Sequence, residues 1–143
     1  MEIRPLSDAY AVSPQIAPED VPAIAAAGYT TVVCNRPDGE NPPALAAAQL
    51  RAAVEDAGLT FVDNPFDAMT LSEAHVDAQG AAIDGAPGPV LAYCASGNRS
   101  SVVWALAQAG RQPAEALIGA AARHGYRLEG LRSQIEALAA RKG

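Results

Sequence analysis

The fold is decided by residues 89–101, which read Pro-Val-Leu-Ala-Tyr-Cys-Ala-Ser-Gly-Asn-Arg-Ser-Ser. Residues 89–93 are mostly apolar and predict a buried strand. Residues 94–100 form a polar, glycine-containing loop, and residues 101–109 predict a helix. A loop that leaves a buried strand and enters a helix gathers backbone N–H groups at the positive end of the helix. This stretch therefore predicts an anion-binding loop in an α/β fold.

The rest of the chain alternates between short β-rich segments and longer helical segments. This alternation predicts an α/β fold with a central, mostly parallel sheet flanked by helices. Further strands are expected at 29–34 and 59–62, with a small edge hairpin formed by 3–6 and 10–12. Helices are expected at 17–28, 43–57, 70–83, 113–124 and 129–141, the third opened by a capping box in Thr70-Leu71-Ser72-Glu73. Because no linker or repeat interrupts the 143 residues, residues 1–143 are expected to form one domain.

Composition and charge exclude several classes of function. The net charge of -6 argues against binding to nucleic acid or to an anionic membrane surface, because both need a basic footprint. No apolar run approaches the roughly 20 residues of a membrane span, and the start MEIRPLSDAY lacks the pattern of a signal peptide, so a cytoplasmic location is expected. The two cysteines and two histidines are scattered, and we expect neither a metal nor another cofactor.

Cys94 is the candidate nucleophile. A thiol at a helix N-terminus beside an arginine is stabilised as the thiolate, which is the reactive form. Gly97 allows a positive φ, and Ser100 is expected to cap the helix or to hydrogen-bond the thiolate. The alternative is that Cys94 is a small buried apolar residue at a strand end. The residues expected to bind an anion are Ala95, Ser96, Gly97, Asn98 and Arg99.

Two polar loops supply weaker candidates. Asp67, with Asp63 as a second choice, is a candidate general acid, although aspartates in such loops mostly form turns. Arg36 follows a central strand and either contacts substrate or forms an ion pair within its own turn, where Asp38 and Glu40 are the acids. Cys34 either packs in the core or serves as a resolving thiol for Cys94.

Residues 28–40, residues 93–100 and the following Trp104-Ala105-Leu106 resemble a small bacterial family, the phosphatase-like domain of the beta-lactamase hydrolase-like proteins. The resemblance covers nearly the whole chain and implies the fold of the protein tyrosine and dual-specificity phosphatases. Some members of the family are described as sulfurtransferases, often fused to or encoded near persulfide-oxidising enzymes. The resemblance thus implies a fold and a reactive cysteine, and it leaves the reaction open.

The spacing within the loop favours sulfur transfer. Only four residues separate Cys94 from Arg99, one fewer than in phosphatases of this fold, and the spacing is similar to that of rhodaneses. A shorter loop has fewer inward N–H groups and should hold a single sulfur atom more easily than a tetrahedral phosphate. The first expectation is a sulfurtransferase that forms a Cys94 persulfide from a small anionic sulfur donor and passes the sulfur to a thiol acceptor, with a persulfide-oxidising enzyme as a partner. The alternatives are a phosphatase that acts through a Cys94 phosphocysteine and a non-catalytic anion-binding protein.

Overall fold

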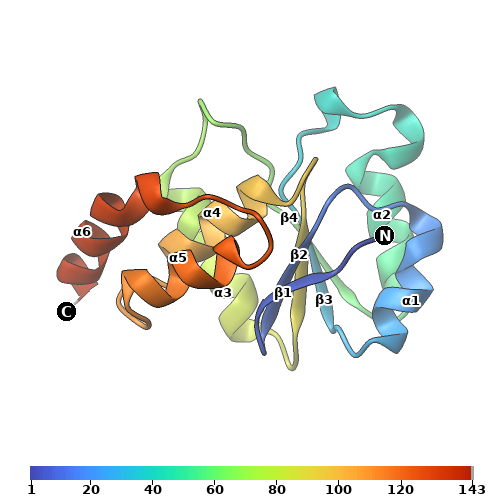
Figure 1. Cartoon of the computed structure of the whole chain (residues 1–143). Helices are drawn as coiled ribbons and strands as arrows, with labels where there is room; N and C mark the ends of the chain where they lie inside the picture. Colours follow the sequence, from blue (N-terminus) through green and yellow to red (C-terminus); the bar gives the residue numbers. More distant parts are fainter. Residues whose placement is uncertain (143) are drawn as a thin grey trace.

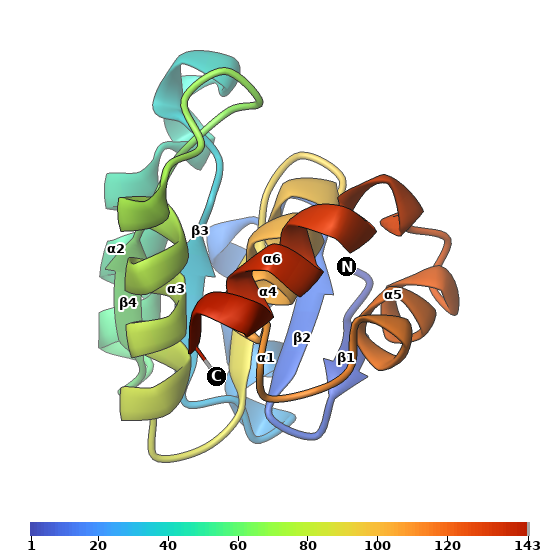
Figure 2. The same cartoon turned by 90° about the vertical axis from the view of Figure 1, so that its left-hand side faces the viewer.

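The computed structural model describes residues 1–142 and contains a five-stranded sheet with helices on both faces (Figures 1 and 2). The strands are β1 (Arg4–Ser7), β2 (Tyr10–Ser13), β3 (Thr31–Cys34), β4 (Thr60–Asp63) and β5 (Val90–Tyr93). Their order in the sheet is β1-β2-β5-β3-β4, and only β1 is antiparallel to its neighbour. The predicted α/β fold with a mostly parallel sheet is therefore confirmed.

The helices form two unequal layers. α1 (Val21–Ala26) and α2 (Ala47–Asp56) cover one face of the sheet (Figure 1). The other face carries α3 (Glu73–Gly85), α4 (Asn98–Ala107), α5 (Ala114–Ala122) and α6 (Arg132–Lys142). Short 3-10 turns lie at Pro18–Asp20, Asp38–Glu40, Pro43–Leu45 and Glu129–Leu131. None of the helices between residues 1 and 142 has the length and apolar character that a membrane crossing requires.

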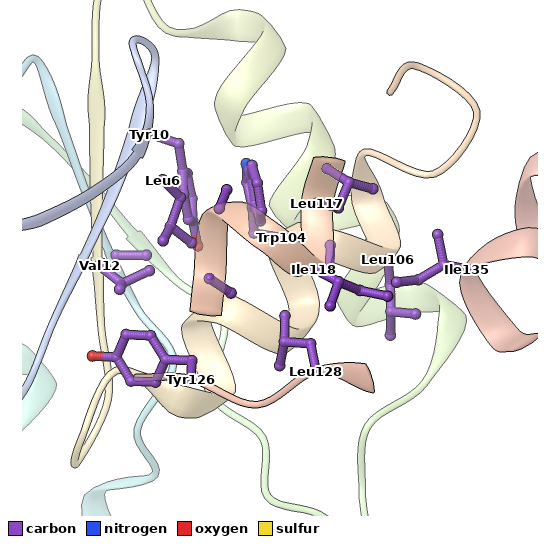
Figure 3. Close-up of a cluster of buried hydrophobic side chains, with 14 of the residues drawn as sticks. Leu6, Tyr10, Val12, Trp104, Leu106, Leu117, Ile118, Tyr126, Leu128 and Ile135 are labelled. Carbon is purple, nitrogen blue, oxygen red and sulfur yellow. The ribbon is translucent and has the colours of Figure 1, made fainter. Parts of the chain in front are cut away.

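Alternation along the strands divides the interior into two cores. Val90 and Ala92 of β5 face the layer of α4, whereas Leu91 and Tyr93 face α1 and α2. The larger core is centred on Trp104, whose ring stacks on Tyr10 with centroids 5.9 Å apart (Figure 3). Because β5 is covered on both faces, the residues that point to either side of the sheet are apolar, as in other buried parallel strands.

Several predicted boundaries were wrong. The 3–6 and 10–12 hairpin exists, but β2 is an interior strand, because it also pairs with β5. The single helix expected at 17–28 is a 3-10 turn followed by α1, and the helix expected from residue 43 begins at Ala47 after a separate 3-10 turn. The helix expected from residue 101 begins at Asn98. Gly97, with a positive φ of 95°, is the cap residue directly before it.

The capping box of α3 was also placed wrongly. Ser72 is the residue before the helix, and its N–H donates to Nδ1 of His75 at 3.1 Å. Thr70 belongs to the preceding turn, where its Oγ1 accepts a hydrogen bond from the N–H of Asp67 at 2.9 Å. The helix therefore begins at Glu73, and the sequence pattern was shifted by two residues from the true cap.

A buried network of amide side chains joins the carboxyl ends of the strands to α3. Gln79 of α3 is fully buried, and its Nε2 donates to Tyr10 Oη and to Asn35 Oδ1, both at 3.0 Å. Its Oε1 accepts from Nδ2 of Asn35 and of Asn64, both at 2.9 Å. Ser100 Oγ completes the network by donating to Asn35 Oδ1 at 2.9 Å. The network fixes the loops that follow β3 and β4 relative to the start of α4.

Replacing Gln79 with methionine should lower the free energy of unfolding by about 2–4 kcal/mol. Methionine keeps the side-chain length but leaves one buried N–H of Asn35 and one of Asn64 without an acceptor, and each such unsatisfied donor costs about 1–3 kcal/mol. Chemical denaturation measures the change. Gln49→Met, at an exposed position of α2, is the control and should change stability by less than about 0.5 kcal/mol. Equal effects of the two substitutions would show that the network contributes little.

Candidate active site

The site lies at the carboxyl edge of the parallel strands, the edge where ligands bind in sheets of this kind. β2, β3, β4 and β5 all end there, and the Cys94 loop begins directly after β5. The loops 35–46 and 64–72 rise from the same edge, at the top of Figure 1. The sheet therefore brings three polar loops together around Cys94.

Cys94 is fully buried at the base of the loop. Its N–H donates to the carbonyl of Ser13 at 3.4 Å, and the carbonyl of Ala95 accepts a hydrogen bond from the N–H of Gln15 at 3.2 Å. The N–H of Gly97 points back at Cys94 and donates to Sγ at 3.1 Å. The loop thus directs a backbone donor at the sulfur, an arrangement that favours negative charge there.

The other loop residues take three different positions. Ala95, Ser96 and Asn98 are exposed at the rim, and Asn98 and Arg99 begin the first turn of α4. Ser100 is fully buried, and its hydroxyl proton goes to Asn35 Oδ1. The expected hydrogen bond from Ser100 to the thiolate is therefore absent, because the network behind the loop already uses that proton.

Arg99 is held by two partners on neighbouring loops. Its Nη1 and Nη2 donate to the two carboxylate oxygens of Glu40 at 2.8 and 2.7 Å, and Nη1 also donates to the carbonyl of Phe66 at 3.1 Å. A guanidinium has five N–H donors, so the parallel Nε–H and second Nη2–H remain available on the adjacent edge. Two parallel donors of this kind match the geometry of an oxyanion.

The charges around Arg99 reinforce one another. The hydrogen bonds that Arg99 donates to Glu40 raise the pKa of Arg99 the most. Partial burial lowers this pKa, and the neighbouring Cys94 sulfur raises it further. The same contacts hold the pKa of Glu40 below its ordinary value of 4.5. Arg99 is therefore a permanent cation beside the sulfur.

Arg36 joins the same carboxylate. Its Nε lies 3.3 Å from Glu40 Oε1, its Nη2 donates to the Glu40 carbonyl at 3.0 Å, and its Nη1 donates to Gln15 Oε1 at 3.3 Å. The ion pair within the turn, one of the two alternatives for Arg36, is thus present. Sequence reasoning missed the link from Glu40 to Arg99, which are 59 residues apart and share no local pattern.

The two candidate acids lie on different sides of the sheet edge. Asp67 follows Phe66, whose carbonyl contacts Arg99, and its Oδ1 accepts hydrogen bonds from the N–H groups of Met69 and Thr70 at 2.8 and 3.0 Å. Asp63 ends β4 beside Cys34, and partial burial raises the pKa of its carboxyl, with the nearby Asp38 adding to the effect. Asp67 forms a turn and also belongs to the loop that touches Arg99.

Cys34 faces away from the Cys94 loop. It packs with Tyr93 in the core beneath α1 and α2, and its thiol donates to the Arg36 carbonyl at 3.3 Å. Burial raises the pKa of this thiol. Both cysteines are free thiols. Because adjacent positions on a strand face opposite sides of the sheet, a Cys34–Cys94 disulfide would need the backbone to move.

Replacing Gly97 with alanine should disorganise the loop. A Cβ at this position would overlap the hydroxyl of Tyr126, and the φ of 95° is strained for any L side chain. We expect a loss of about 1–3 kcal/mol in unfolding free energy, together with weaker binding of oxyanions measured by competitive inhibition. Gly119→Ala, in the middle of α5 with open space around it, is the control and should stabilise the fold slightly. Unchanged oxyanion binding in Gly97→Ala would contradict the loop geometry.

The Arg99–Glu40 pair should contribute to stability only above the titration range of Glu40. The pKa of Glu40 is lower in the folded state than its ordinary value of 4.5. The contribution of the pair to stability is therefore present above pH 4.5 and is lost as the pH falls through the lower folded-state pKa. At neutral pH the free energy of unfolding of wild type should exceed that of Glu40→Gln by up to about 1 kcal/mol, since the pair is partly exposed. In acid the two free energies should converge. Denaturation curves at several pH values measure the gap, with Glu55→Gln as the control for an exposed pair. A gap that persists in acid would exclude the ion pair as its cause.

Comparison with known proteins identifies the fold. The sequence profile of the beta-lactamase hydrolase-like protein, phosphatase-like domain, matches residues 2–111. A crystal structure from Neisseria meningitidis Z2491, provisionally described as a phosphatase, is 34% identical and superposes with a TM-score of 0.82 over 96% of this chain and 99% of that one. PTPMT1 in complex with PI(5)P is 14% identical and has a TM-score of 0.76 over 99% of both chains, which shows a shared fold alone. The fold is that of the protein tyrosine phosphatase-like proteins.

Among curated proteins, the beta-lactamase hydrolase-like protein of Xylella fastidiosa strain Temecula1 is 30% identical over 130 residues. These residues are 90% of this chain and 30% of the relative, so the chain spans less than a third of that protein. The family expected from the residues around Cys94 is confirmed. The chain belongs to the family of the beta-lactamase hydrolase-like protein, phosphatase-like domain.

Proposed function

We propose that the chain is a cysteine-dependent phosphatase that hydrolyses phosphomonoesters. The observation that carries the proposal is the pairing of two donors at one point: the N–H of Gly97 lies 3.1 Å from Cys94 Sγ, and Arg99 is fixed beside it with one edge available. The similarity to a protein described as a phosphatase extends over almost the whole chain. It supports phosphatase activity as the first candidate and sulfur transfer as the second.

In the proposed reaction, the Cys94 thiolate attacks the phosphorus of the ester. The S–P bond forms while the P–O bond to the leaving group breaks, which gives a phosphocysteine and an alcohol. Loop N–H groups and the available edge of Arg99 stabilise the oxygens of the transferring group as their charge is redistributed. Water then attacks the phosphocysteine, and inorganic phosphate leaves with Cys94 restored as the thiolate.

Asp67 is the candidate that would protonate the leaving oxygen. It lies on the loop that contacts Arg99, whereas Asp63 lies beside Cys34 on the α1 and α2 face. One of its oxygens is held by the turn, so the other would act on the leaving group. A general acid contributes most for leaving groups that are poor anions.

Sulfur transfer is the second candidate, and the length of the loop favours it. Four residues separate Cys94 from Arg99, and Cys94 is fully buried, so the space suits a small group. Here Cys94 would attack the outer sulfur of a persulfide, the donor S–S bond would break, and the donor thiolate would leave. A thiol acceptor would then take the outer sulfur from the Cys94 persulfide. This exchange needs no acid, because a thiolate is a good leaving group.

Assays of one set of variants test the proposal. Cys94→Ser should abolish release of phosphate from an aryl phosphate, and Arg99→Lys should lower kcat/KM about 100-fold, because lysine cannot offer two parallel donors. Asp67→Asn should slow alkyl phosphates more than aryl phosphates with good leaving groups. Cys34→Ser is the matched control, since Cys34 is a buried thiol that faces the other core, and it should retain activity.

Parallel assays with glutathione persulfide and a thiol acceptor separate the candidates. Absence of phosphate release together with Cys94-dependent sulfur transfer would replace phosphatase by sulfurtransferase. Absence of both activities would favour the non-catalytic, anion-binding alternative and would contradict the proposal.

A further inference from the structure

We propose that Arg4 and Tyr126 are positioning residues that stabilise the Cys94 thiolate through the peptide unit between Ser96 and Gly97. The inference rests on the proposed function only in requiring that Cys94 react as a thiolate, and it holds equally for phosphate and for sulfur chemistry. Tyr126 lies beyond residues 2–111, the part that the family profile matches, so nothing in that match assigns it a role.

A continuous series of hydrogen bonds leads from Arg4 to the sulfur. Arg4 Nη1 donates to Tyr126 Oη at 2.7 Å, and Tyr126 Oη donates to the carbonyl of Ser96 at 2.8 Å. The next group in the series is the N–H of Gly97, which donates to Cys94 Sγ at 3.1 Å. Each donor thus points toward Cys94, and the positive charge of Arg4 stands at the far end.

The polarity of the series is fixed. A guanidinium can only donate, so Tyr126 Oη accepts from Arg4, and its single proton is left for Ser96. The C=O and N–H of a planar trans peptide point in opposite directions. When Tyr126 holds the Ser96 carbonyl outward, the N–H of Gly97 must therefore face inward, toward Cys94. Hydrogen bonds arranged in this way polarise one another, and each strengthens the next.

Packing keeps Tyr126 in place. Tyr126 is 6% exposed at the edge of the larger core, and its hydroxyl points out of the core (Figure 3). The guanidinium carbon of Arg4 lies 5.6 Å from the ring centroid. Gly97 has no side chain, and the hydroxyl of Tyr126 occupies the space that a Cβ there would need. Strand β1 and the segment after α5 thus meet at the outer side of the Cys94 loop.

Other charged and titratable groups also face this region. Arg99 adds positive charge beside Cys94, with Glu40 and Arg36 behind it, and Tyr10 lies close enough to interact with the sulfur. Glu2 partly neutralises Arg4 through a 2.9 Å contact. Removal of the Tyr126 hydroxyl touches none of the hydrogen bonds of Arg99, Glu40 and Arg36 and releases only Arg4, which is itself the start of the series. Its effect therefore isolates the series of hydrogen bonds.

The test is an ultraviolet titration of the Cys94 thiolate. Thiolate absorbance is followed against pH in wild type and in Tyr126→Phe, and the signal of the corresponding Cys94→Ser protein is subtracted in each background. Phenylalanine keeps the packing but ends the series, so the thiolate fraction of Cys94 at neutral pH should fall roughly three- to tenfold. Arg4→Gln, which leaves the ring and loop intact, should give a smaller fall, and Arg4→Lys should restore part of it.

Tyr29→Phe is the matched control, because the Tyr29 hydroxyl makes no side-chain hydrogen bond within residues 1–142. It should titrate like wild type. A normal wild-type thiolate signal that Tyr126→Phe and Arg4→Gln leave unchanged would overturn this inference and leave the proposed function standing. A wild-type Cys94 with no thiolate at neutral pH would overturn both.

Discussion

The orientation of one peptide unit, between Ser96 and Gly97, is the constraint on which the site depends. Its N–H donates to Cys94 Sγ, and its carbonyl accepts from Tyr126. Only glycine satisfies both demands at position 97, a positive φ and no side chain against the tyrosine hydroxyl. The central position of β5, between β2 and β3, fixes the sulfur itself, so the turn and the sheet together determine what Cys94 faces.

The buried hydrogen-bond network behind the Cys94 loop consists of neutral side chains. Asn35, Asn64 and Gln79 satisfy one another in the buried network and leave no unpaired charge beneath the site. The charge beside Cys94 is that of Arg99, whose ion pair with Glu40 ties α4 to the loop after β3. This division lets the site carry a cation beside a thiol without a second buried charge to oppose it.

Local patterns predicted most of the fold and singled out Cys94 as the candidate nucleophile. Strands such as β5 were found because burial on both faces selects apolar residues at every position. The start of α4 was placed three residues late, because the left-handed conformation of Gly97 is set by the tertiary fold. Contacts across the chain could not be predicted: Glu40 lies 59 residues from Arg99, and Tyr126 lies 30 residues from Ser96. Asp67 was chosen as a candidate acid by its residue type, and the turn expected as the alternative is present. The contact of the neighbouring Phe66 carbonyl with Arg99 spans 33 residues and could not be predicted.

The central claim is that Cys94 forms the covalent intermediate, and intact-protein mass spectrometry of quenched reactions tests it most directly. Wild type and Cys94→Ser are quenched during turnover of an aryl phosphate and, separately, after brief exposure to glutathione persulfide. The account predicts a phosphoryl adduct that maps to Cys94, is absent from Cys94→Ser and disappears when substrate is exhausted. An adduct on another residue, or active enzyme that never carries an adduct of either kind, would contradict it.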